Sequence, residues 1–108
     1  MRAVVESLVE AIAAQKRVRL GYRRQADEVT SVHEVAPLDI QPGDTTRTRG
    51  SEYLWAWCFA EDKLERHLMQ RILRVEILDV EFDPEWVYER WPQGWLRPAE
   101  WRVPRPWS

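Results

Sequence analysis

The residues that most often carry chemistry are few in this chain and far apart in sequence. There are two histidines, His33 and His67, and a single cysteine, Cys58. Metal-binding motifs place such ligands a few residues apart, so this spacing predicts no metal site. Cys58 lies in an apolar, aromatic run, where a buried thiol is expected, because reactive thiols need an electropositive, partly exposed setting. The histidines suit a binding site better, since an imidazole can be neutral or charged near pH ~6.5.

Neither a cofactor nor an enzymatic reaction is predicted. The four glycines are dispersed, so no glycine-rich loop of the kind that cradles phosphates is present in the sequence. The carboxylates fall in acidic turns that are typical of solvated faces. With 16 Lys and Arg against 18 Asp and Glu, the net charge of −2 excludes a strongly basic nucleic-acid coat but leaves room for a local basic face. The 108 residues suit one domain with one small core.

One dense basic segment allows two interpretations. Alternation along a strand would place several of its cations on one face, where together with nearby aromatic rings they could bind short single-stranded nucleic acid. The other interpretation is a solvated face that pairs with the acidic segment after it, and the negative net charge favours this second one. The basic residues are Lys16, Arg17, Arg19, Arg23 and Arg24.

Hydrophobic periodicity indicates which elements position these residues. Apolar spacings of three and four between Val4 and Gln15 predict an amphipathic helix that ends near Lys16. Extended segments follow at 17–23, 32–40, 53–60, 64–70 and 74–82. Pro37 implies an edge strand or a bulge in the second, and a change of face near residues 77–78 implies a bulge in the fifth. The third is apolar on both faces, which predicts a strand covered on both sides.

One helix and about five short strands predict a mainly β fold, a small and strongly bent five-stranded barrel whose closure would remove exposed sheet edges. A single helix is too little for a helix-turn-helix, so no DNA-reading domain is expected. No apolar run approaches the roughly 20 residues that span a bilayer, and no signal peptide is visible. We therefore expect a cytoplasmic protein that does not engage a membrane.

The composition changes after Phe82. Asp83-Pro84-Glu85 predicts a helix start, and the later prolines forbid a long helix or a central strand. We accordingly divide the chain into a barrel domain with its helix at 1–82 and an extension at 83–108. The extension is predicted to be an extended strap that covers the barrel, forms a homodimer seam or docks a regulatory protein partner. Its candidate interaction residues are Trp86, Trp91, Trp95, Trp101 and Trp107.

Four segments in a fixed order carry a resemblance to a known family. They are AIAAQKRVRLGY at 11–22, HEVAPLDI at 33–40, SEYLWAWC at 51–58 and ERHLMQRILRV at 65–75. The first resembles the helix-to-strand entry of the WYL domain of bacterial transcriptional regulators. The other three resemble its R-x-V-x-P-L-x-L, W-Y-L-x-A-x-C and R-x-F-R-L-D-R-I-x-x-V motifs. Three residues differ from these motifs. His33 stands at the arginine of R-x-V-x-P-L-x-L, Glu52 at the tryptophan of W-Y-L-x-A-x-C, and His67 at the phenylalanine of R-x-F-R-L-D-R-I-x-x-V.

The resemblance implies an Sm-like, SH3-type five-stranded barrel with an N-terminal helix. It also implies a ligand-sensing module that responds to nucleotides or short nucleic acids. WYL domains usually follow a DNA-binding winged helix and precede a C-terminal extension domain, and we expect neither in this chain. The basic set that faces the ligand is thinner here than is usual in the family.

Six residues are the candidate ligand-binding set: Arg71, Arg66, Tyr22, Tyr53, His33 and His67. An arginine presents a planar fork to phosphate or carboxylate, and a tyrosine can place its hydroxyl at a pocket rim. The alternatives are a structural ion pair of Arg71 with an acid such as Glu52 or Asp39, and ordinary packing of the rings. Arg66 depends on the alignment, which can slide by one residue. Arg47 and Arg49 could reach a phosphate, although a solvated loop is favoured there.

Two hypotheses for function result. The first is a sensor or accessory subunit that binds a small, anionic ligand, a nucleotide or a short nucleic acid without bond chemistry and without a DNA-binding helix-turn-helix of its own. The second is a protein-interaction or oligomerisation module that uses the Trp-rich tail.

Overall fold

The computed structural model describes residues 2–24, 26–43, 46–47, 50–90 and 102–103. Helix α1 (Arg2–Ala14) leads into the strands β1 (Lys16–Arg23), β2 (Thr30–Pro42), β3 (Glu52–Cys58), β4 (Lys63–Leu68) and β5 (Ile72–Glu81). A 3-10 turn, η1 (Met69–Arg71), joins β4 to β5, and a short helix, α2 (Pro84–Tyr88), follows β5. The mainly β class, the N-terminal helix and the five strands are thus confirmed.

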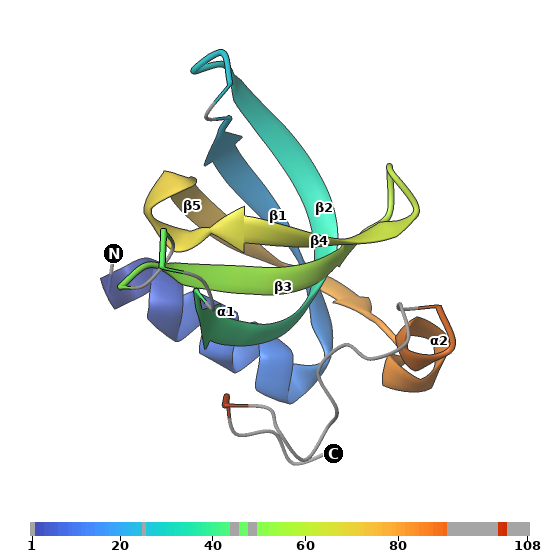
Figure 1. Cartoon of the computed structure of the whole chain (residues 1–108). Coiled ribbons are helices and arrows are strands. Elements are labelled where there is room, and N and C mark those ends of the chain that lie inside the picture. Colours follow the sequence, from blue (N-terminus) through green and yellow to red (C-terminus); the bar gives the residue numbers. More distant parts are fainter. Residues whose placement is uncertain (1, 25, 44–45, 48–49, 91–101, 104–108) are drawn as a thin grey trace.

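The strands form one antiparallel sheet in the order β4-β3-β2-β1-β5. Figure 1 shows how strongly β2 curves as it passes from its pairing with β1 to its pairing with β3. The sheet is nevertheless not closed, because β4 and β5 are its two edges. After Leu68 the chain forms η1 instead of extending a ladder, which leaves β4 with one partner strand. The predicted closed barrel is therefore corrected to an open, bent sheet.

Both predicted bulges are present. The register of β2 against β3 shifts between Pro37 and Asp39. Proline lacks the N–H that a central strand would use, so the irregularity lies where the ladder cannot be continued. The register of β1 against β5 shifts between the pairs Lys16↔Glu81 and Val18↔Ile77, which brackets the residues where the sequence pattern changes face. β2 is a central strand, so the bulge was the correct alternative for Pro37.

The two faces of β3 belong to two apolar clusters. Leu54, Ala56 and Cys58 lie in the main core, where α1 contributes residues such as Leu8 and Ile12. On the opposite face, Trp57 packs with Ala36, Leu38, Phe82 and Val87, and α2 supplies the cover. The prediction that this strand is covered on both sides is confirmed. Cys58 is fully buried, and burial raises the pKa of its thiol.

Helix α2 begins as the sequence predicts. The Asp83 side chain accepts a hydrogen bond from the Glu85 N–H at 3.0 Å, and Pro84 occupies the first turn. The Trp86 ring packs edge-to-face on Trp57, with centroids 5.5 Å apart. Trp86 therefore covers the sheet of its own chain. The remaining predicted interaction residues, Trp91, Trp95, Trp101 and Trp107, lie outside the described residues, and the boundary at residue 82 stays a prediction.

A short C-terminal segment is attached to the sheet through a buried carboxylate. Asp39 is fully buried, and it accepts hydrogen bonds from the N–H groups of Arg102, at 3.0 and 3.2 Å, and of Val103, at 2.8 Å. The Gln41 amide also donates to Asp39. Val103 joins the main core. In the described part of the chain, no helix is long and apolar enough to cross a membrane.

Candidate functional site

Three of the six predicted ligand-binding residues come together on three different strands. Tyr22 of β1 lies edge-on to His67 of β4, with ring centroids 5.1 Å apart, and 6.4 Å from the ring of His33 of β2. The two imidazoles are 5.9 Å apart. His33 pairs with Leu20 across the β1–β2 ladder, and His67 pairs with Leu54 across the β3–β4 ladder. Both leucines belong to the main core, so both histidine side chains lie on the core-facing side of the sheet. We call Tyr22, His33 and His67 the Tyr–His cluster.

Hydrogen bonds hold the Tyr–His cluster in place. The Tyr22 hydroxyl accepts a hydrogen bond from the Leu68 N–H at 3.2 Å, so it ties β1 to the end of the edge strand β4. Its own proton remains available for donation. The Ser31 hydroxyl lies 2.7 Å from His33 Nε2. The cluster thus presents hydroxyl and imidazole groups that can either donate or accept.

His67 is the most buried polar member, with 3% of its surface exposed. Burial lowers the pKa of His67 from 6.5 to about 4, the Glu65 carboxylate raises it and His33 lowers it further. Glu65 Oε2 lies 3.9 Å from His67 Nε2. His67 Nδ1 and Glu65 Oε1 are buried and have no hydrogen-bond partner among the described residues. The imidazole is therefore neutral at pH 7, with one ring nitrogen whose hydrogen-bonding capacity is unused.

Arg71 lies at the same end of the sheet. It is the last residue of η1, which begins directly after Leu68, the residue whose N–H donates to the Tyr22 hydroxyl. It precedes Ile72, which pairs with Tyr22 in the β1–β5 ladder. Arg71 Nη1 is 2.9 Å from Glu28 Oε2, in the turn between β1 and β2. The alternative of a structural ion pair at Arg71 is therefore confirmed, but its partner is Glu28 and not Glu52 or Asp39, the acids suggested from the sequence. Separation along the chain hid the true partner, because Glu28 precedes Arg71 by 43 residues.

Arg66 and Tyr53 form a separate contact away from the Tyr–His cluster. The Arg66 guanidinium lies 4.4 Å from the Tyr53 ring centroid and 5.9 Å from that of Trp55. Successive side chains of a strand point to opposite faces, so Arg66 cannot share a face with its neighbour His67. The structure thus divides the predicted site into two groups, one of them a cation–π contact on the other face of β3 and β4.

The dense basic segment pairs with acids of the same chain. Three of its five cations contact the acidic segment that follows it, as the favoured interpretation predicts, and the other two, Lys16 and Arg19, contact acids of β5 instead. Its cations contact carboxylates on the neighbouring strands and turns at distances from 2.7 to 3.8 Å. The pairs are Lys16–Asp79, Arg17–Glu34, Arg19–Glu76, Arg23–Glu28 and Arg24–Asp27. Most of this charge is neutralised locally, which leaves the segment poorly suited to hold a nucleic-acid backbone.

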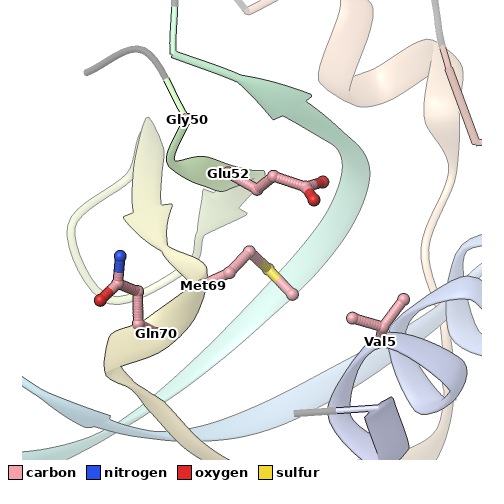
Figure 2. A pocket seen from close by; sticks show the side chains of 5 residues that line it. All are labelled: Val5, Gly50, Glu52, Met69 and Gln70. Carbon is pink, nitrogen blue, oxygen red and sulfur yellow. The ribbon is translucent and has the colours of Figure 1, made fainter.

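A hollow that the sequence did not predict lies between α1, the start of β3 and η1. Figure 2 shows its lining residues, Val5, Gly50, Glu52, Met69 and Gln70, around a volume of about 180 Å³. A neighbouring hollow of about 210 Å³ shares Val5 and Glu52. None of the six predicted ligand-binding residues lines either of them. Residue spacing gives no signal for the first hollow, because its lining residues come from three separated segments of the chain. Among the described residues, no group of three or more His, Cys, Asp or Glu side chains could hold a metal ion.

Comparisons with known proteins agree with this fold. The WYL domain family matches residues 3–77 of the chain. The structure is similar to that of proteasome accessory factor B/C (PafBC) of Arthrobacter aurescens, with a TM-score of 0.66 and 20% identity over 80% of this chain and 13% of that one. This chain thus corresponds to a small part of PafBC, and the likeness is one of fold. No curated protein sequence gives a significant match. Because the family match spans more than half of the sequence, the chain belongs to the WYL domain family.

Proposed function

We propose that this WYL-family chain is a ligand-sensing regulatory module that binds a small anionic ligand, a nucleotide or a short single-stranded nucleic acid, without bond chemistry. The observation that carries the proposal is the convergence of Tyr22, His33 and His67 at the end of the sheet where Arg71 lies. Arginine binds phosphate with two parallel hydrogen bonds, while the cluster offers hydroxyl and imidazole groups for the rest of a polar ligand.

The Arg71–Glu28 pair supplies a means of sensing. The Glu28 side chain is 59% exposed and belongs to the β1–β2 turn, so its carboxylate now occupies the position that an anion would take on Arg71. A phosphate that binds Arg71 would displace Glu28. The turn would then lose its contact with η1, and binding would be converted into a change of shape at the end of β1 and β2. A surface ion pair with one well-exposed partner contributes only about 0–1 kcal/mol, so displacing Glu28 from Arg71 costs little free energy.

The expected effect of Arg71→Ala is a loss of affinity for the anionic ligand of about tenfold or more, which corresponds to about 1.4 kcal/mol. A hydrogen bond that involves a charged group contributes about 1.5–3 kcal/mol, which is enough to account for a tenfold loss of affinity. The measurement is calorimetric titration with nucleoside mono-, di- and triphosphates and with short oligonucleotides. Arg19→Ala is the matched control, because Arg19 is also an arginine in a short pair with a glutamate, here 3.0 Å from Glu76.

Glu28→Gln should act in the opposite direction in the same titrations and tighten binding, since Arg71 then loses its competing carboxylate. Absence of binding to every phosphate and oligonucleotide would remove support for the proposal. An Arg71→Ala variant that binds as tightly as the wild type would also count against it, as would a loss of affinity in Arg19→Ala that equals the loss in Arg71→Ala.

A further inference from the structure

The hollow in Figure 2 combines an apolar wall with one charged rim residue. Val5 of α1 and the side chain of Met69 from η1 provide the wall, and Figure 2 shows the Met69 thioether extending toward Val5. Met69 is 4% exposed and belongs to the main core, so the wall is fixed by the fold. In Figure 2 the Glu52 side chain and the Met69 side chain both extend toward the side of the hollow on which α1 lies. Gly50 and Gln70 complete the rim.

Glu52 differs from the acids beside the basic strand because no side chain in the described part of the structure pairs with it. Its carboxylate makes no hydrogen bond or ion pair with another described residue. The neighbouring hollow that shares Val5 and Glu52 is lined by Arg102 as well, so a ligand cation is expected on the Gln70 side of Glu52, away from Arg102. An unpaired carboxylate above an apolar wall selects a ligand with a cationic group and an apolar body.

The wall of the hollow indicates the shape of that body. The sulfur of Met69 offers a favourable contact to an aromatic ring. Both the space and its wall therefore suit a planar aromatic group.

We propose that this hollow binds a small aromatic amine, with its ring between Val5 and Met69 and its ammonium group on the Glu52 carboxylate. The site is distinct from the anion site at Arg71: it has the opposite charge preference and shares no residue with the Tyr–His cluster. Success or failure of either proposal leaves the other standing.

The test uses two probes with the same ring and opposite charge, tryptamine and indole-3-acetate, titrated into the full chain. Binding is located through the methyl resonance of Met69 in NMR spectra. Tryptamine should shift this resonance and bind at least about tenfold more tightly than indole-3-acetate, because the ion pair is gained in one case and like charges meet in the other. Equal affinity for the two probes, or a tryptamine titration that leaves the Met69 methyl unchanged, overturns the proposal.

Two substitutions at Glu52 separate charge from space. Glu52→Gln should weaken tryptamine binding by about fivefold, the value of an exposed ion pair, and bring the two probes closer in affinity. Glu52→Trp should fill the hollow and abolish the Met69 shift. Glu61→Gln is the matched control, since Glu61 is an exposed carboxylate in the turn between β3 and β4. The proposal is contradicted if Glu52→Gln and Glu61→Gln bind tryptamine alike. Arg71→Ala should leave tryptamine binding unchanged, which distinguishes this site from the anion site.

Discussion

Replacing Asp39 with alanine should lower the free energy of unfolding by about 3 kcal/mol, because it leaves buried backbone donors without an acceptor. The carboxylate is fully buried and accepts hydrogen bonds from the N–H groups of both Arg102 and Val103. An N–H left buried and unsatisfied costs about 1–3 kcal/mol. The substitution creates one of these at Val103 and also removes the acceptor from the part-buried N–H of Arg102. Since small domains are stable by only about 5–15 kcal/mol, urea-induced unfolding would show the loss clearly.

A truncation tests whether Asp39 stabilises the fold by holding the segment that contains Arg102 and Val103, or in some other way. Deleting residues 102–108 removes the donors and strands the carboxylate, so it should cost about as much as Asp39→Ala. Combining the two changes should cost little more than either alone, because they break the same contact. Asp39→Asn, which keeps one acceptor oxygen, should lie between the wild type and Asp39→Ala. A cost below about 1 kcal/mol for Asp39→Ala, or full additivity with the truncation, would show that this contact does not stabilise the fold.

The second large effect is a loss of stability as the pH falls from 6.5 toward 4. The folded state lowers the pKa of His67 from 6.5 to about 4, chiefly through burial. In that window the unfolded chain binds a proton at this imidazole and the folded chain does not, so acid favours the unfolded state. A difference of this size corresponds to a loss of up to about 3 kcal/mol at the acid end of the window. Urea unfolding at a series of pH values measures it.

Carboxylates also titrate at the low end of this window, so the contribution of His67 is isolated by substitution. His67→Phe, the residue type of the resembling motif, removes the imidazole and retains a ring. The pH dependence between 6.5 and 4 should become shallower by the amount that His67 contributes. His33→Gln should narrow the window, because His33 helps to lower the pKa of His67. A pH profile of His67→Phe that is parallel to that of the wild type would contradict this account.

Local patterns in the sequence were sufficient to predict the elements and their buried faces. Alternation in the third extended segment correctly assigned Leu54, Ala56 and Cys58 to one covered face and Trp57 to the other. The helix start at Asp83 also depends on neighbouring residues alone and is confirmed. Closure of the sheet was predicted wrongly, because it depends on where β4 ends and how η1 redirects the chain, and neither follows from a count of strands.

The candidate site was predicted only in part, for two different reasons. Alternation within β4 separates Arg66 from His67, and the sequence already contained this information. By contrast, the pairing of Arg71 with Glu28 joins η1 to a turn 43 residues earlier, where Glu28 has a φ of +57°. The contact of Asp39 with Arg102 spans 63 residues. Such contacts depend on tertiary geometry that residue spacing does not reveal.

The central claim is that the Tyr–His cluster and Arg71 form one anion-binding site. An NMR titration of the isotope-labelled chain with a short oligonucleotide tests it most directly, because it reports on every residue at once. We expect shifts at Arg71, Tyr22 and His33, little change at Arg66, and loss of the shifts in Arg71→Ala. Shifts concentrated along Arg17 and Arg19 or at Arg66, with Arg71 and both histidines unchanged, would contradict the claim.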